Sequence, residues 1–332
     1  MSFDERRVHT EGAAGIAEPQ RRTKYTTDTI QPVASITKTL VGYLLADLVT
    51  RDRLSLDAPI DTYLPWKVRH PAYPETPITL RQLATHTSGL IDREDVYNLS
   101  YEKGDTPSIT MREFVRRYTA SDGIWFQRGN FGPDAPGRRY EYSNLGAALA
   151  AVAIEEIARE AFDAYARRMV LEPVGMKDSA FWPDVARKAR RAVLVDAVGQ
   201  PLAPYVGVTY ADGGLRTTCR DMAKYAQAVL RARLGLPSAL SPRAIALMLT
   251  PQFDERALPA NFRRVNQGLF WQFNPKEGLG HSGGDPGVTA HLYLDPSAPM
   301  GYVLMANVST EDNASAAEGV RQVWQALRAP RR

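Results

Sequence analysis

The sequence has a single cysteine and no long apolar run. Cys219 can form no internal disulfide, and one thiolate cannot build a metal cluster. This cysteine use fits a reducing compartment. No stretch approaches the roughly 18 apolar residues that a membrane-spanning helix requires. The start, Met1 to Arg7, also lacks the apolar core of a secretion signal. As written, we expect a soluble cytoplasmic protein without a membrane span.

Charge of one sign is not concentrated anywhere in the chain. The 41 lysines and arginines nearly balance the 37 aspartates and glutamates, and basic residues gather only in short pairs such as Arg138–Arg139. The absence of a basic tract argues against nucleic acid as a partner. No Gly-rich loop indicates a nucleotide and no His/Asp/Glu spacing indicates a metal, so we expect no cofactor. A small molecule is the expected partner, and nothing in the sequence indicates the oligomeric state.

The composition is that of a soluble globular enzyme. The 332 residues are 44% apolar and 23% charged, enough to bury one large core or two modest ones. Apolar spacing and capping signals predict helices over 32–49, 79–89 and 144–170, one from Thr218-Cys-Arg-Asp221 onward, and one after Ser309-Thr-Glu-Asp312. The closing helix has an apolar stripe of Val320, Val323, Trp324 and Leu327. Strands are predicted at 270–273, 289–295 and 301–308, the last two as a hairpin.

Helices in the middle and strands at the end imply an α/β layer interrupted by an all-α insertion. Within the middle, residues 92–140 mix glycine, proline, charge and aromatic side chains without a clear period. Such irregular segments usually line a site or cover it. The alternative is a peripheral helical pair joined by loops, and composition does not decide between the two.

Ser35 and Lys38 stand three residues apart near the start of the first predicted helix, whose first turn suits Pro32. Their spacing puts both side chains on one helical face. Serine becomes a good nucleophile when a base takes its proton, and a buried lysine whose pKa falls well below its usual ~10.4 can do so. The helix N-terminus also offers N–H groups to a developing oxyanion. Alone, the pair is a weak signal, because such a pair more often belongs to an ordinary amphipathic helix.

Two further polar motifs decide the interpretation. Tyr140-Glu-Tyr-Ser-Asn144 opens the Ala-rich helix, and Gly280-His-Ser-Gly-Gly-Asp-Pro-Gly287 stands just before a predicted strand. Ser-x-x-Lys, Tyr-Ser-Asn and His-Ser-Gly, in this order, resemble the three active-site motifs of the serine β-lactamase and penicillin-binding protein superfamily. The resemblance is strongest to class C β-lactamases and their esterase and D-peptidase relatives. Further landmarks occur in the family's order, at residues 83–90, 171–176, 213–218 and 280–307.

The resemblance implies a β-lactamase-like fold, α/β (α+β), with an antiparallel sheet flanked by helices. Residues 1–332 would form one catalytic domain, made of an α/β subdomain (1–55 and 205–332) and an all-α insertion (56–204). The family usually places a helix and a strand pair ahead of the stretch at Gly12 to Ala17. In this chain only eleven residues precede that stretch. Either the sheet lacks strands or the true start lies upstream, and the second case leaves the presence of an export signal open.

The family's functional residues carry over one by one. Ser35 would be the acylated nucleophile and Lys38 its proton partner. Tyr142 would be the second general acid or base, its phenol kept acidic by Lys38, and Asn144 would bond the Lys38 amine and the substrate. The wall and the oxyanion hole are expected at His281, Ser282, Gly283 and Gly284, with the N–H groups of Ser35 and Gly284 as donors. Whether Lys38 or Tyr142 takes the first proton stays open, because the pair should titrate as a unit.

Position 281 departs from the family pattern. Many β-lactamases carry a lysine there, which helps to hold the antibiotic's carboxylate, whereas esterases and D-peptidases often vary. His281 therefore favours a serine hydrolase that acts on carboxylic esters through an acyl-enzyme. A D-peptidase or D-aminopeptidase, a weak β-lactamase, and a non-catalytic penicillin-binding or sensor domain remain as alternatives.

Two rival nucleophile arrangements are disfavoured. Gly280-His-Ser-Gly-Gly284 matches the nucleophile elbow of α/β-hydrolases, which would make Ser282 the nucleophile. That fold needs a well-separated downstream histidine, and the only later one is His291, nine residues on. His86 suggests a triad, but a histidine at the end of a short helix is more often a structural hydrogen-bonding residue.

Overall fold

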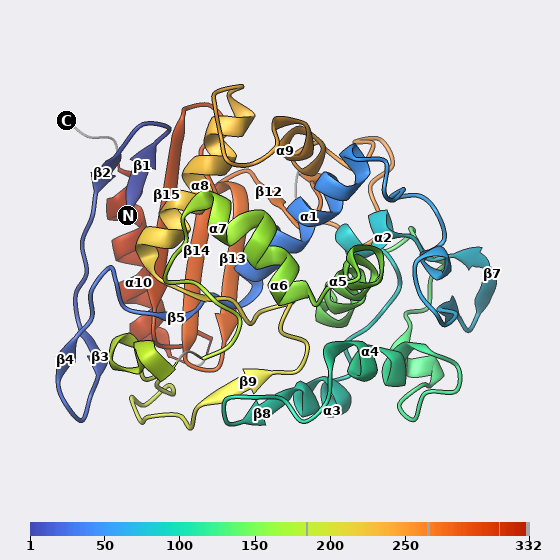
Figure 1. The fold of residues 1–332 in the computed structure, drawn as a ribbon, viewed down its shortest axis with the longest axis horizontal. Coiled ribbons are helices and arrows are strands. Elements are labelled where there is room, and N and C mark those ends of the chain that lie inside the picture. The colour runs from blue at the N-terminus through green and yellow to red at the C-terminus, as the bar shows by residue number, and fades with distance from the viewer. Residues whose placement is uncertain (184, 264–265, 312, 330–332) are drawn as a thin grey trace.

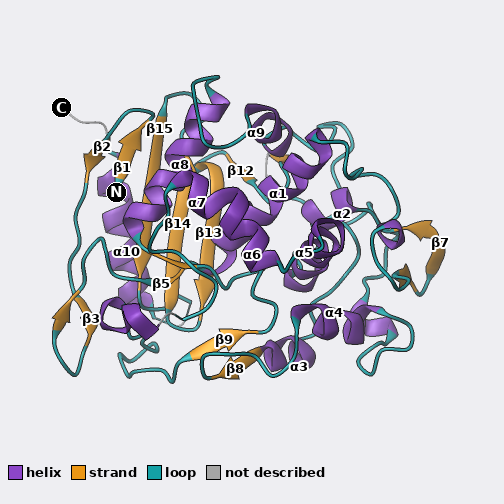
Figure 2. Cartoon of the chain, in the orientation of Figure 1, coloured by secondary structure: helices purple, strands orange, loops and turns teal. Residues whose placement is uncertain are grey.

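One antiparallel sheet forms the centre of the computed structural model, which describes residues 1–183, 185–263, 266–311 and 313–329 (Figures 1 and 2). The strand order is β11-β12-β13-β14-β15-β1-β2. In that order the strands are Asn266–Gln267, Gln272–Asn274, Gly278–Asp285, Val288–Leu294, Met300–Ala306, Ser2–Asp4 and Val8–Thr10. The predicted antiparallel sheet flanked by helices is confirmed, as is the β14–β15 hairpin.

The N-terminal residues complete this sheet. In the β1–β15 pair, Phe3 lies opposite Gly301, and the amino group of Met1 donates to the Val303 carbonyl oxygen at 2.6 Å. A β-carbon on Gly301 would lie 2.3 Å from the Phe3 ring, so glycine is needed at this crossing. The suggestion that the sheet lacks its first strands is wrong, because residues 2–10 form β1 and β2.

Alternate side chains of β14 face opposite layers, as the period of two in a strand requires. Ala290 and Leu292 join the main core, to which α8 (Cys219–Arg233) contributes, whereas Tyr293 packs against Trp324 of α10 (Ala314–Arg328). Figure 1 shows α8 in front of the sheet and α10 behind it. The two helices therefore cover opposite faces of the sheet.

The closing helix differs in detail from its prediction. Its N-cap is Asn313, whose side chain accepts from the Ala316 N–H, rather than the predicted Ser309. Trp324 is buried, but Val323 is 58% exposed and does not belong to the buried stripe. The stripe is therefore narrower than the sequence suggested.

The remaining helices gather beside the sheet around two that are buried almost all round, α1 (Lys38–Thr50) and α5 (Asn144–Ala158). Helices that are apolar on every side belong in a core. The other helices are α2 (Leu80–Ala84), α3 (Glu94–Tyr97), α4 (Met111–Thr119), α6 (Phe162–Ala166), α7 (Glu172–Val174) and α9 (Pro242–Met248). Short 3₁₀ segments lie at Ala34–Thr37, Ile60–Thr62, Asn98–Ser100, Arg128–Asn130 and Val185–Arg190, and a π-helical segment at Arg167–Leu171 joins α6 to α7.

Four short strand pairs lie outside the main sheet. They are β3 (Ile16–Glu18) with β4 (Thr23–Lys24), β5 (Gln31–Pro32) with β10 (Arg216–Thr217), β6 (Arg69–His70) with β7 (Tyr73–Pro77), and β8 (Tyr101–Lys103) with β9 (Tyr205–Gly207). The segment predicted to be all helical thus also contains short strands. The proposed division into two subdomains stays a prediction.

Three predicted elements have different bounds. The helix expected over 144–170 ends at Ala158, because Arg159 takes a left-handed conformation (φ +54°) and the chain restarts as α6. The helix expected to stop at Gly89 ends at Ala84, just ahead of His86 with φ +56°. The strand expected from residue 270 begins at Gln272.

Strand β13 was not predicted, although it carries the His-Ser-Gly motif. The motif was placed just before a strand, yet it lies inside the eight-residue strand itself. Glycines are unfavourable in strands by intrinsic propensity, and β13 has several of them. Its pairing with both β12 and β14 overrides that propensity.

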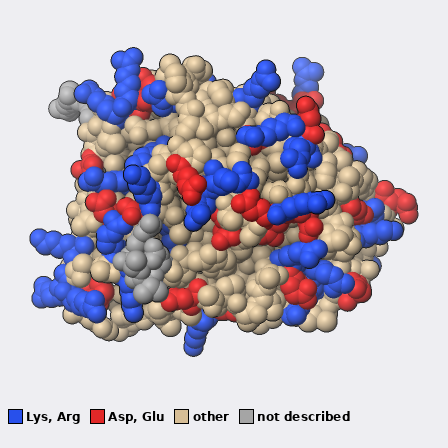
Figure 3. Space-filling model, viewed as in Figure 1, with Lys and Arg blue, Asp and Glu red and all other residues tan. Residues whose placement is uncertain are grey.

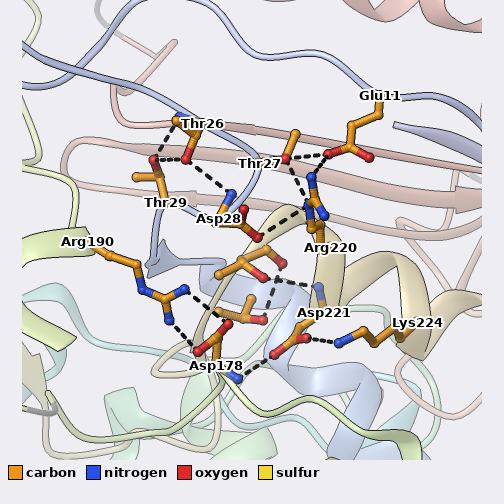
Figure 4. Close-up of polar contacts among 12 residues, drawn as sticks. Glu11, Thr26, Thr27, Asp28, Thr29, Asp178, Arg190, Arg220, Asp221 and Lys224 are labelled. Carbon is orange, nitrogen blue, oxygen red and sulfur yellow. Dashed lines mark hydrogen bonds and ion pairs between the residues drawn. The ribbon is translucent and has the colours of Figure 1, made fainter. Parts of the chain in front are cut away.

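The first turn of α8 anchors two distant loops (Figure 4). Arg220 forms ion pairs with Glu11 and Asp28, which holds the segment ahead of the nucleophile. Asp221 accepts from the Asp178 N–H at 2.7 Å and pairs with Lys224. The helix begins where predicted, with Thr218 accepting from the N–H of its third residue at 3.1 Å.

Basic and acidic side chains are interspersed over the face shown in Figure 3. This agrees with the even charge distribution along the sequence. Within the described ranges, no helix combines the length and apolarity needed to cross a bilayer.

Candidate active site

Ser35 lies on a tight turn rather than inside the predicted helix. Pro32 belongs to β5, residues Ala34–Thr37 form a 3₁₀ turn, and α1 begins at Lys38. Ala34 has φ +46°, a conformation that residues other than glycine rarely adopt. Such strained positions concentrate at functional sites, where surrounding structure holds them in place. The turn leaves the Ser35 side chain half-buried, at the wall of a cavity.

Lys38 is fully buried directly behind Ser35. Its Nζ donates to Ser35 Oγ at 3.0 Å, to Asn144 Oδ1 at 2.7 Å and to the Asp212 carbonyl oxygen at 2.7 Å. An ammonium has three N–H donors, so these acceptors use all of them. The predicted contact between Asn144 and the Lys38 amine is present.

The charge state of Lys38 differs from the prediction. Burial acts to lower the pKa of Lys38, but nearby Tyr142 and Asp212 favour the charged form and leave the pKa above its ordinary value. The sequence argument expected a lowered pKa of Lys38 from burial, and it did not include Asp212, which only the fold places near the amine. Lys38 is therefore a cation in this arrangement.

Tyr142 reaches the same serine from the opposite side of the site. Its hydroxyl lies 2.8 Å from Ser35 Oγ, and Lys38 Nζ lies 5.1 Å from the centre of its ring. The Ser35 hydroxyl is thus in contact with both predicted proton-transfer groups.

Asp92 holds the element that presents Tyr142 and Asn144. Its carboxylate accepts from Ser143 Oγ at 2.7 Å, from the Asn144 N–H at 2.5 Å and from the Leu145 N–H at 3.0 Å. These donors are in the first turn of α5, where unpaired N–H groups favour a carboxylate. Burial nevertheless raises the pKa of Asp92. Sequence reasoning missed this residue, although it lies in the irregular segment expected to line the site.

His86 has the structural role that the sequence favoured. Its Nδ1 accepts from the Ser143 N–H at 3.2 Å, and its ring centre lies 4.4 Å from that of Tyr142. The histidine therefore packs against the phenol and fixes the backbone beside it.

Strand β13 forms the wall facing the nucleophile turn. A β-carbon on Gly283 would lie 2.2 Å from the Val33 carbonyl oxygen, so only glycine permits this approach. His281 Nδ1 donates to the Ser282 carbonyl oxygen at 2.5 Å, while its Nε2 accepts from Gln272 Nε2 at 3.3 Å.

The predicted residues meet at one cavity of about 360 Å³. Of these residues, the ones that line it are Ser35, Tyr142, Asn144, His281, Ser282 and Gly284. Lys38 lies behind Ser35, and Gly283 packs against the nucleophile turn. Sequence reasoning missed Tyr97, Tyr101, Asp212, Gln272, Asp285 and Glu311 as lining residues. Both views of residues 92–140 hold in part, because Tyr97 and Tyr101 line the cavity whereas Phe114 packs in the core.

Ser282 does not occupy a nucleophile elbow. An elbow lies at a sharp turn between a strand and a helix. Ser282 instead lies within β13, paired with His291 of β14. This placement agrees with the rejection of Ser282 as the nucleophile.

Comparison with known proteins identifies the family. The family profile described as Beta-lactamase matches residues 3–325. The chain belongs to this family. The D-alanyl-D-alanine-carboxypeptidase/endopeptidase AmpH of Escherichia coli K12 is 26% identical over 304 residues, which cover 89% of this chain and 75% of AmpH. Esterase EstB of Burkholderia gladioli is 31% identical over 197 residues, 57% of this chain and 47% of the esterase.

The solved structures agree on the fold. The penicillin-binding protein from Bacillus halodurans superposes with a TM-score of 0.75 at 22% identity, covering 98% of this chain and 94% of that one. The predicted β-lactamase-like fold is thereby confirmed. As a member of the Beta-lactamase family, the chain is a serine hydrolase, as its three motifs predicted.

Proposed function

We propose that Ser35 is the nucleophile of an acyl-transfer reaction and that Tyr142 takes its proton. The observation that carries this proposal is the contact of Ser35 Oγ with both Tyr142 and Lys38, at 2.8 and 3.0 Å. Because the charged Lys38 has its N–H groups engaged, the Tyr142 oxygen, as a phenolate, is the group available to accept the proton. The nearby Lys38 ammonium stabilises this phenolate before the transfer.

The proposed reaction has two halves. Ser35 Oγ bonds to the carbonyl carbon as its proton passes to Tyr142, and the anionic oxygen is held by the N–H groups of Ser35 and Gly284. Two such donors are worth ~3 kcal/mol or more to a tetrahedral anion. The intermediate collapses as Tyr142 returns the proton to the leaving group, which leaves an acyl-enzyme on Ser35. Water then attacks the acyl carbon by the same proton route and releases the acid.

Carboxylic esters are the proposed substrates, because the cavity is poorly suited to a substrate carboxylate. Among the described residues that line it there is no lysine or arginine, and three are acidic: Asp212, Asp285 and Glu311. β-Lactam antibiotics and the C-terminal ends of peptides both bring a carboxylate that such a wall repels. Similarity to EstB supports an ester substrate.

A D-aminopeptidase is the second candidate, and the similarity to AmpH supports an amide of D-amino acids. An aminopeptidase acts on the amino end of a peptide, so it avoids the repulsion that a terminal carboxylate meets here. Chemical labelling and a substrate panel separate these candidates from a non-catalytic domain.

The test is peptide mapping after treatment with a fluorophosphonate, which labels activated serines. We expect one adduct, on Ser35, and none in a Ser35→Ala variant. The labelled protein should also lose hydrolysis of p-nitrophenyl acetate. Absence of any adduct on the folded protein would contradict the proposal and favour a penicillin-binding or sensor domain.

A further inference from the structure

Three carboxylates from separate parts of the chain face the cavity that holds Ser35. Asp212 precedes Gly213, Asp285 ends β13, and Glu311 follows β15. No lysine or arginine lines this cavity, and none of the three carboxylates forms an ion pair within the described residues. This wall is thus acidic, and Lys38 (on Asp212 and Asp285) and Arg216 (on Asp285) act on it only at longer range than an ion pair.

The acidic wall lies very close to the nucleophile turn. A β-carbon on Gly213 would lie 3.4 Å from Asp285 Oδ2 and 3.6 Å from the Ala34 backbone. One glycine therefore separates Asp285 from the residue beside Ser35. On the other side, a β-carbon on Gly284 would lie 3.4 Å from Glu311 Oε1. Because Gly213 and Gly284 have no side chains, they leave the Asp285 and Glu311 carboxylates accessible from the cavity.

Among the described residues, the lining tyrosines donate hydrogen bonds to two of these carboxylates without bringing a positive charge. The Tyr101 hydroxyl donates to Asp285 Oδ1 at 2.6 Å, and the Tyr97 hydroxyl donates to Asp212 Oδ2 at 3.3 Å. Both donors are neutral. Lys38 lies near Asp212, but its Nζ bonds the carbonyl oxygen of that residue and two other acceptors.

Burial disfavours the ionised forms of Asp212 and Asp285. Asp212 is only 6% exposed, and burial raises its pKa to about 7. Burial also raises the pKa of Asp285 to about 6. An incoming cation would restore the ionised form of both groups and gain charge-assisted hydrogen bonds. A metal ion fits poorly, because no three acidic, histidine or cysteine side chains among the described residues are grouped to hold one.

Building on the proposed function, we propose that this acidic wall binds a free ammonium group of the substrate. The preferred substrates are then esters or amides of amino acids whose amino group is unblocked. In these compounds the ammonium is attached to the atom next to the carbonyl carbon. When that carbon is at Ser35, the ammonium has to lie close by, where Asp212 and Asp285 are found.

The experiment compares alanine methyl ester with N-acetylalanine methyl ester, in both enantiomers, at pH 7.5. The two esters differ in the ammonium charge and share the scissile bond. We expect kcat/KM to be about tenfold or more higher for the free amine, the effect of one charge-assisted hydrogen bond. The ratio should fall as ionic strength rises, because salt screens the attraction.

Asp285→Asn and Glu311→Gln remove the charge with little change of shape. Each should lower the free-amine to N-acetyl ratio severalfold, and the double variant should lower it further, with Asp212 as the remaining carboxylate. Glu172→Gln is the matched control, since Glu172 lies in α7, outside the cavity lining, and pairs with Arg167. Fluorophosphonate labelling of each variant confirms that the site is folded.

The outcomes separate this inference from the proposed function. If Ser35 is labelled and N-acetyl ester is hydrolysed but the ratio is one or less, the ammonium site is wrong and the hydrolase proposal stands. A ratio that stays at the wild-type value in the double variant also overturns the assignment to these carboxylates. If Ser35 is not labelled and neither ester is turned over, the proposed function fails and this inference fails with it.

Discussion

The phenol oxygen of Tyr142 lies 2.8 Å from the hydroxyl oxygen of Ser35, although the two residues are 107 positions apart in the sequence. Ser35 is fixed by the turn that leads into α1, and Tyr142 by the residues just ahead of α5. The two buried helices therefore set the distance over which the proton is proposed to move.

Tyr142→Phe removes the proposed proton acceptor and keeps the ring that packs against His86. We expect the rate of acylation by p-nitrophenyl acetate to fall by roughly 10²–10⁴, the usual contribution of a positioned general base. Stopped-flow measurement of the p-nitrophenol burst gives this rate. An unchanged rate would remove Tyr142 from the mechanism.

Ser35→Ala and Ser282→Ala distinguish the two candidate nucleophiles. Loss of Ser35 should abolish the acyl-enzyme, whereas loss of Ser282 removes only a hydroxyl from the cavity wall. We expect Ser282→Ala to retain fluorophosphonate labelling at Ser35 and to lose much less of kcat/KM. Equal losses in both variants would favour the nucleophile elbow instead.

Asp92→Ala should impair the site by destabilising the start of α5, which presents Tyr142 and Asn144. The substitution leaves three donors of the first turn of α5 without their acceptor, and we expect a loss of about 1–3 kcal/mol of unfolding free energy. The rate of fluorophosphonate labelling should also fall, because Tyr142 and Asn144 lose their support.

Two further variants show whether Asp92 acts by positioning. Asp92→Asn keeps one accepting oxygen and should recover part of the labelling rate. Asp163→Ala is the control. Asp163 lies in another helix, α6, and its carboxylate accepts from Trp182 Nε1 at 2.8 Å. It should lower stability without slowing labelling. If Asp92→Ala labels at the wild-type rate under folding conditions, its role is structural only.

Gly283→Ala should separate β13 from the nucleophile turn, because the new β-carbon would lie 2.2 Å from the Val33 carbonyl oxygen. Overpacking of this kind destabilises proteins by about 1–3 kcal/mol. We expect both a lower melting temperature and a large loss of kcat/KM. Gly319→Ala is the control: its β-carbon would meet nothing within 4 Å in α10, so it should be neutral or stabilising. Wild-type activity in Gly283→Ala would contradict the close approach.

Asp212→Asn should stabilise the protein at neutral pH more than in acid. The pKa of Asp212 rises from 3.8 to about 7 on folding, so between these values the native state binds more protons than the unfolded state. Stability from this group is full below pH 3.8 and is lost as the pH rises through 7. The charged groups that face it are Lys38, Asp285 and Asp92.

Denaturant unfolding of the wild type and of Asp212→Asn at pH 4.5 and 8 tests this linkage. The advantage of the variant should grow by roughly 1–4 kcal/mol between these values, since one pKa unit is about 1.4 kcal/mol. Comparing variant with wild type cancels the other titrating groups, including the buried His291. A constant difference across this range would show that Asp212 folds without a shifted pKa.

The sequence alone determined the family and the residues that meet at Ser35. The chemistry of a serine hydrolase requires particular side chains in a fixed order, and Ser35, Lys38, Tyr142 and Asn144 lie within short motifs that are visible without coordinates. The sheet of the second half was also predictable where strands are rich in apolar residues, as in β14 and β15. Local spacing and composition carry this information.

The tertiary structure decided what depends on distant neighbours. It made a strand of glycine-rich β13 by pairing it on both sides, and it kept Lys38 charged by placing Tyr142 and Asp212 around it. It brought Asp212, Asp285 and Glu311 to one cavity from three separate segments. Strand pairing, burial and electrostatic interaction all act between residues far apart in sequence, so no local pattern records them.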